Sequence, residues 1–201
     1  MFCSAFNGCS NSGINHTAIA DFDKLDTIVG ELEQICDAFS ELKDSIDALP
    51  APDALAYPAD ELAVATAKRD FNTFKANNSA AQDPLAPILA DDYAKLNACI
   101  DKMEQLKFAA LIEQCKGEIA READAALQSI INGAWDGSTW YRSIENERDT
   151  AYAALDELVY NQSYNNANGA PVTAAVKADE ITDVAIALIR DLLSNYYTAR
   201  P

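Results

Sequence analysis

Apolar side chains recur between residues 25 and 49 at alternating intervals of three and four positions. The row consists of Leu25, Ile28, Leu32, Ile35, Phe39, Leu42, Ile46 and Leu49. This is the a/d pattern of a heptad repeat and predicts one amphipathic helix. A third apolar row adjoins it at the e positions, with Phe22, Val29 and Cys36. A stripe of this width favours burial among several helices over a two-stranded coiled coil.

Acidic side chains dominate the opposite face of this predicted helix. They are Asp21, Asp23, Asp26, Glu31, Glu33, Asp37, Glu41, Asp44 and Asp47, against Lys24 and Lys43. Like charges on one helix repel each other, so we do not expect this helix to be stable alone. It needs packing against the rest of the chain or against another subunit.

Helical periodicity continues through most of the remaining chain, after a stiff connector that contains Pro50, Pro52 and Pro58. We predict further helices over residues 60–75, 89–131, 139–160 and 172–197. In the last of these we expect a buried stripe of Val176, Ile181, Val184, Leu188 and Leu192. Asn168-Gly169 is the strongest turn signal in the loop 161–171, and no convincing pair of strands is found.

These elements predict an all-α fold, an elongated antiparallel helical bundle of four to five helices. Residues 1–18 lack any period and are interpreted as an irregular, flexible N-terminal arm, and residues 19–201 as the bundle domain. A chain of 201 residues is long enough to bury a core without a metal ion or a disulfide.

The net charge of −17 argues against nucleic-acid binding, because an acidic surface repels phosphate. No apolar run approaches the ~18 residues that a membrane span requires. The first residues also lack the basic and long apolar segments of a signal peptide. We therefore expect the protein to stay where it is made, or to leave by assembly or lysis.

Five cysteines leave at least one without an intrachain partner. Cys36, Cys99 and Cys115 lie in helical patterns and are expected to be small buried hydrophobic residues. Cys3 and Cys9 lie in the arm, where exposed thiols can form inter-chain disulfides in an oxidising setting.

Candidate chemistry is sparse. His16 is the only histidine, so di-iron, haem and catalytic zinc sites lack ligands, and no C-x-x-C pair is present for structural zinc. Glycine-rich phosphate loops and a serine nucleophile motif are also missing. We expect no catalytic, cofactor or metal site, and no enzyme activity.

Two clusters remain as candidates. Arg142, Glu145 and Arg148 could bind an anion, but their i, i+3, i+6 spacing places them on only part of one face, and a solvated row of ion pairs is the preferred interpretation. The aromatic residues Trp135, Trp140, Tyr196 and Tyr197 are candidate interface residues, because large aromatic side chains often dominate protein interfaces.

A non-enzymatic structural or assembly protein is the leading functional interpretation. It would form helix-mediated contacts with other subunits in a homo-oligomer or a larger particle, and a virion component such as a phage tail, baseplate or neck part is one natural home. The alternative is an acidic adaptor, chaperone or inhibitor that docks on a basic partner protein, with a cytoplasmic location. A small helical enzyme that uses Arg142, Glu145 and Arg148 comes third.

We expect the arm cysteines to cross-link neighbouring chains in the native material. Non-reducing gels should then show ladders that collapse when a reductant is added, because Cys3 or Cys9 of one chain is joined to a second chain. A single monomer band in both lanes contradicts this expectation.

Overall fold

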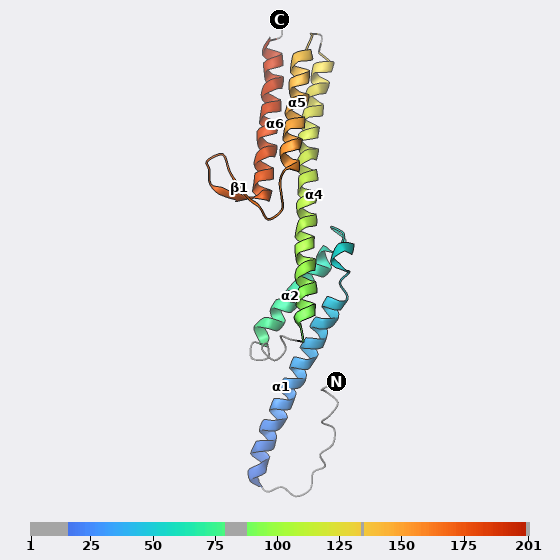
Figure 1. Cartoon of the computed structure of the whole chain (residues 1–201), viewed down its shortest axis with the longest axis vertical. Helices are drawn as coiled ribbons and strands as arrows, with labels where there is room; N and C mark the ends of the chain where they lie inside the picture. The colour runs from blue at the N-terminus through green and yellow to red at the C-terminus, as the bar shows by residue number, and fades with distance from the viewer. Residues whose placement is uncertain (1–15, 79–87, 134, 200–201) are drawn as a thin grey trace. The chain divides into compact units, whose positions relative to one another are not determined.

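The computed structural model describes residues 16–78, 88–133 and 135–199 (Figure 1). In this part of the chain it contains five α-helices, a 3-10 helix and one small antiparallel sheet. The elements are α1 (His16–Asp47), η1 (Pro52–Ala54), α2 (Glu61–Asn77), α4 (Ala90–Ile131), α5 (Ser138–Asp156), β1 (Ser163–Asn165), β2 (Pro171–Thr173) and α6 (Ala174–Ala199). The predicted all-α class is confirmed.

The chain divides into two compact units, residues 1–103 and residues 104–201. α4 contributes its first turns to the first unit and the rest of its length to the second. Residues 16–18, which we assigned to the arm, belong to α1. Cys3 and Cys9 lie outside the described residues, so the predicted cross-link remains a prediction.

The core of the first unit lies where the C-terminal half of α1 packs against α2 and the beginning of α4. α2 buries Val64, Ala67 and Phe74 on one face. The other buried apolar residues of this unit are Leu42, Ile46, Leu49, Leu55, Leu89, Leu96, Cys99 and Met103. The a/d pattern of α1 therefore predicts its buried face correctly in this half of the helix.

Two lysines join α1 to α4 in this unit. Lys95 donates from Nζ to the carbonyl oxygens of Ile46 and Asp47, at 2.9 and 3.2 Å, in the last turn of α1. The Ile46 carbonyl also accepts a hydrogen bond from the Leu49 N–H at 3.1 Å. Lys43 on α1 pairs with the largely buried Asp92 carboxylate at 3.3 Å. These contacts fix where α1 ends against α4.

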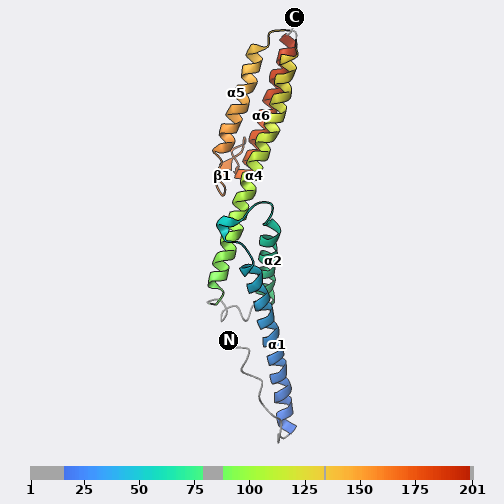
Figure 2. The ribbon, with the colours of Figure 1, turned by 90° about the vertical axis from the view of Figure 1, so that its right-hand side faces the viewer.

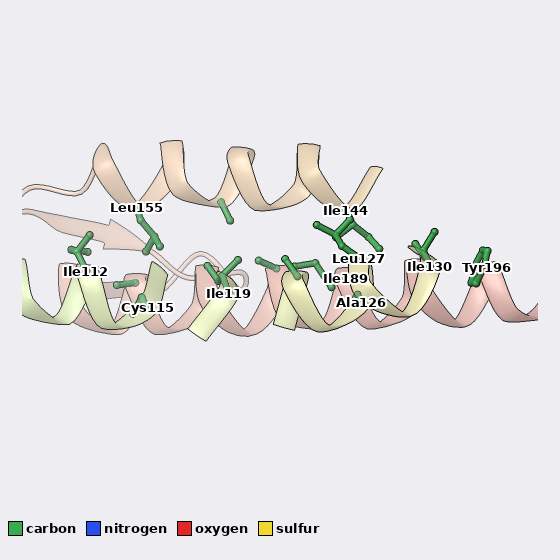
Figure 3. Close-up of a cluster of buried hydrophobic side chains, with 14 residues drawn as sticks. Ile112, Cys115, Ile119, Ala126, Leu127, Ile130, Ile144, Leu155, Ile189 and Tyr196 are labelled. Atoms are coloured by element: carbon green, nitrogen blue, oxygen red, sulfur yellow. The ribbon is translucent and has the colours of Figure 1, made fainter. Parts of the chain in front are cut away.

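The second unit is a three-helix bundle of α4, α5 and α6 (Figures 1 and 2). Its apolar side chains point into the space between the helices, as Figure 3 shows for Ile119, Ile144 and Ile189. Arg190 on α6 binds the Glu122 carboxylate on α4 through two hydrogen bonds of 2.9 Å. The Tyr152 hydroxyl on α5 donates to the Lys116 carbonyl oxygen on α4 at 3.0 Å.

α6 buries a different face from the one we predicted. Its buried side chains are Ala174, Ala178, Thr182, Ala185, Ile189 and Tyr196. Of the predicted stripe, Val176, Val184 and Leu188 are exposed instead. Both faces of α6 carry apolar residues at helical spacing, so periodicity did not distinguish them. In the first half of α6 the structure places the smaller residues Ala174, Ala178, Thr182 and Ala185 inside, and small side chains let helices pack closely.

A short hairpin between α5 and α6 corrects the expectation that the chain has no strand pair. β1 and β2 pair antiparallel, with Tyr164 opposite Val172. The predicted turn lies between them, and Gly169 has a φ of 80°, which glycine adopts without steric cost. α5 ends at Asp156 rather than at Tyr160, because the chain turns there toward the hairpin.

Tyr196 packs in the second unit against the turn between α4 and α5. A Cβ on Gly133 would lie 1.9 Å from the Tyr196 hydroxyl, and a Cβ on Gly137 would lie 2.9 Å from the edge of its ring. Both positions therefore require glycine for the ring to fit. Among the described residues the Tyr196 hydroxyl has no hydrogen-bond partner, although it is buried.

We expect Gly133→Ala to lower the free energy of unfolding by about 1–3 kcal/mol, because the new methyl group collides with the Tyr196 hydroxyl. Tyr196→Phe removes that hydroxyl and should restore part of the lost stability in the double variant. Chemical denaturation followed by circular dichroism measures both effects.

Gly117→Ala is the matched control, since a Cβ added at this position of α4 would meet no atom within 4 Å. It should raise stability by up to ~1 kcal/mol, the usual gain in helix propensity. A Gly133→Ala variant as stable as Gly117→Ala would contradict the close packing of Tyr196.

Candidate functional site

The N-terminal half of α1 carries the largest departure from a buried core. Leu25, Ile28 and Leu32 are 53, 51 and 54% exposed, whereas Ile46, on the same stripe, is fully buried. Phe22 in the adjoining e row is also exposed. Large aliphatic side chains aligned on one exposed helix face are typical of a protein interaction surface. We call Phe22, Leu25, Ile28, Leu32 and Ile35 the α1 surface stripe.

Among the described helices of this unit, α2 and α4 are too short to reach the N-terminal part of the stripe, and Ile35, at its C-terminal end, is half-buried. The end of α2 lies beside Leu42 and Ala38, where Phe74 contacts Phe39 with ring centroids 6.4 Å apart. α4 begins at Ala90, close to its contact with Lys43. Figures 1 and 2 show no other described helix of this unit beside the first turns of α1.

Charged side chains lie on the outer face of the helix and, at Lys24 and Glu31, along one edge of the stripe. The exposed acids are Asp23, Asp26, Glu31, Glu33, Asp37 and Glu41. Cys36 is exposed beside the stripe, so the expectation that it is a buried residue was wrong. Its e position lies at the edge of the apolar face, which α2 and α4 do not reach.

A second apolar surface lies on α6, which sequence reasoning assigned to the core. Val184 and Leu188 are exposed, and the partly buried Ile181 precedes them by one turn. Ile181 and Val184 border a shallow hollow between α5 and α6 whose α5 side includes Ala151 and Ala154. Charged side chains line the same hollow, among them Glu147, Lys177, Glu180 and Asp183, and Lys177 pairs with Glu180 at 3.3 Å.

The aromatic candidates gather in one cluster inside the second unit. Tyr196 lies at its centre, with ring centroids 5.7 Å from Trp135, 6.0 Å from Trp140 and 5.4 Å from Tyr197. Tyr196 is fully buried and is a core residue rather than a surface one. Trp135 and Trp140 are half-buried, and Tyr197 is half exposed, so Tyr197 is the member most open to a partner.

Of the candidate residues Arg142, Glu145 and Arg148, the structure brings Glu145 near Arg148, whose pKa is raised mainly by its hydrogen bond with Asp149 and also by the charge of Glu145. Arg148 pairs with Asp149, the next residue, through a hydrogen bond from Nε and an ion pair at 3.0 Å. Arg142 is exposed on the same helix. In residues 16–78, 88–133 and 135–199 no group of three or more His, Cys, Asp or Glu side chains lies close enough to hold a metal ion.

Cys99 and Cys115 are buried free thiols, as predicted. Burial raises the pKa of both thiols, since the apolar surroundings disfavour the thiolate. A protonated thiol is a weak nucleophile, so these residues act as small core side chains.

None of the helices that the structure describes is both long and apolar enough to span a membrane. Comparisons of the chain with protein-family models, with curated protein sequences and with solved structures found no significant match.

We expect substitutions at the two ends of the apolar row of α1 to differ strongly in their effect on the free energy of unfolding. Ile46→Ala should lower the free energy of unfolding by about 2–5 kcal/mol, because it leaves a cavity in the first unit. Leu32→Ala should change it by less than about 0.5 kcal/mol, because the side chain lies at the surface. Denaturation is measured at protein concentrations low enough to prevent association, and a comparable loss in both variants would show that Leu32 is packed within its own chain.

Proposed function

We propose that the protein is a non-enzymatic structural or assembly protein, and that the α1 surface stripe forms helix-mediated contacts with other subunits of a homo-oligomer or a larger particle. The observation that supports this function is a heptad stripe that is buried at one end and exposed at the other. Exposure of an apolar helix face to water is unfavourable in free energy, so a partner surface that covers it is the natural explanation.

The size of the hydrophobic effect supports an interface. Full burial of a leucine or isoleucine side chain is worth about 1.5–3 kcal/mol relative to exposure. Leu25, Ile28 and Leu32 are each about half exposed, so about half of this stabilisation is still available from burial against a partner. The isolated turns of α1 are also only marginally stable in water, and a partner that covers them would stabilise the helix itself.

A virion is a suitable setting for such a subunit, for example in a phage tail, baseplate or neck. A subunit of a particle acts through its contacts with other subunits, and the exposed apolar side chains on α1 and α6 offer two separate contact faces. The placement in a virion rests on this fit alone.

The alternative is an acidic adaptor, chaperone or inhibitor that docks on a basic protein. The exposed acids on the outer face of α1, among them Asp26, Glu33 and Asp37, favour it. The two functions respond oppositely to salt. Screening weakens attraction to a basic partner, whereas it strengthens association between acidic copies of this chain.

The test is the substitution of Leu32 by glutamate. In light scattering and native mass spectrometry we expect the wild-type chain to form an oligomer and Leu32→Glu to be monomeric, because a carboxylate in the stripe cannot be buried without a partner. Gln34→Glu is the matched control. It adds the same charge within the same turn, on the exposed outer face, and should leave the oligomer intact.

Two outcomes would contradict the assembly function. One is a wild-type chain that stays monomeric at high concentration and in high salt. The other is an oligomer that Leu32→Glu and Gln34→Glu weaken equally, which would assign the contacts to general charge rather than to the stripe.

A further inference from the structure

We propose that residues 22–38 of α1 assemble with the same segment of three other copies of the chain as a parallel, in-register, four-stranded coiled coil. This inference rests on the proposed assembly function and names both the partner and the number of chains. It follows from which side chains occupy the core positions, how wide the exposed stripe is, and which charges flank it.

The core positions carry the residues that favour more than two strands. Leu25 and Leu32 occupy a positions, and Ile28 and Ile35 occupy d positions. Leucine at a with isoleucine at d shifts parallel coiled coils from dimers to trimers and tetramers, because the angle at which each side chain enters the core changes with the number of strands. The shape of the side chains therefore argues against a pair of helices.

The width of the exposed stripe argues for four strands. The e row beside the core contains Phe22, Val29 and Cys36, and Phe22 and Cys36 are exposed. In a dimer only the a and d rows are covered. Each added strand brings a neighbour closer to the e row, so an apolar e row is best covered in a four-helix arrangement.

The flanking charges select a copy of this chain over a basic helix. The g row holds Lys24, Glu31 and Ala38, and the e row in this segment is uncharged. These edge positions therefore carry no net charge with which to attract a basic partner. The acids of the outer rows, such as Asp26 and Glu33, point away from the stripe into solvent.

The same edge positions favour a parallel arrangement. In register, the g side chain of one helix meets the e side chain five residues later on its neighbour, so Lys24 meets Val29 and Glu31 meets Cys36. In an antiparallel arrangement with full overlap, Glu31 would face Glu31 of the other copy, and this pair of like charges would oppose association.

The first unit sets the end of the proposed coil. Beyond the α1 surface stripe, the next residue of the apolar row, Phe39, contacts Phe74 of α2. From Leu42 onward the apolar row is buried within its own chain. The coil therefore contains the layers of Leu25, Ile28, Leu32 and Ile35, and further turns are not available to other copies.

The decisive experiment exchanges the two core residues without changing composition. The variant Leu25→Ile, Ile28→Leu, Leu32→Ile and Ile35→Leu places isoleucine at a and leucine at d, the combination that favours dimers. Sedimentation equilibrium of the full chain under reducing conditions should give four times the chain mass for the wild type and a lower multiple, ideally two, for the variant.

A wild-type dimer or trimer that Leu32→Glu still dissociates would overturn the four-stranded inference and leave the assembly function standing. A tetramer whose mass the exchange does not alter would also overturn it, because another surface would then set the number. A wild-type monomer sinks both proposals. If deletion of residues 1–15 turns that monomer into an oligomer, the arm of the same chain is the occupant of the stripe.

Orientation is tested separately, in a chain with Cys3, Cys9 and Cys36 replaced by serine. In a parallel, in-register coil residue 25 meets residue 25 of the neighbouring copies, so Leu25→Cys should form inter-chain disulfides on mild oxidation. Gln34→Cys, on the outer face, is the control and should form far fewer. Equal cross-linking at the two positions, or none at residue 25 in an intact tetramer, would overturn the parallel arrangement.

Discussion

The structure of the first unit depends on one constraint: α1 carries an apolar stripe that is longer than the helices available to cover it. α2 ends at Asn77 and α4 begins at Ala90, and both reach only the C-terminal half of α1. The stripe is therefore core around Ile46 and surface around Leu25 and Leu32. This difference in cover, rather than any reactive group, is the basis of the functional argument.

The second unit solves its packing differently. α6 presents small residues such as Ala178 and Ala185 to the bundle, and these allow the helices to approach closely. The larger Val184 and Leu188 remain outside as a result. Packing is also close at the turn between α4 and α5, where Gly133 and Gly137 leave room for the buried ring of Tyr196. α6 therefore has small side chains on its buried face and larger apolar side chains on its exposed face in the region of Ala178 to Leu188.

Within the described residues, no group of three or more His, Cys, Asp or Glu side chains lies close enough to hold a metal ion. The buried thiols of Cys99 and Cys115 are held protonated by their surroundings, and Arg148 is paired with its neighbour Asp149. What the two units do offer is apolar surface, on α1 and on α6. The proposed assembly function accounts for both surfaces. Exposure of their apolar side chains to water is unfavourable in free energy, and a partner that covers them removes this unfavourable term.

The sequence by itself determined which segments are helical and the position of one turn, but not the start of α1, the end of α5 or the hairpin. The 3–4 spacing in α1, the prolines after α1 and the Asn168-Gly169 turn all act locally, and the structure confirms the helix, its end and the turn. Which of two apolar faces is buried is not local. It depends on the side chains that arrive from other helices, so spacing predicted the core correctly around Leu42 and Ile46 and wrongly at Val184 and Leu188.

Only the tertiary structure decided where the stripe of α1 leaves the core. Leu32 and Ile46 occupy equivalent a positions in the same helix, and nothing in their spacing separates them. The difference comes from α2, whose last turn lies beside Ala38 and Leu42 and leaves the earlier turns of α1 uncovered. Burial is a property of neighbours, and neighbours are set by the length and placement of distant elements.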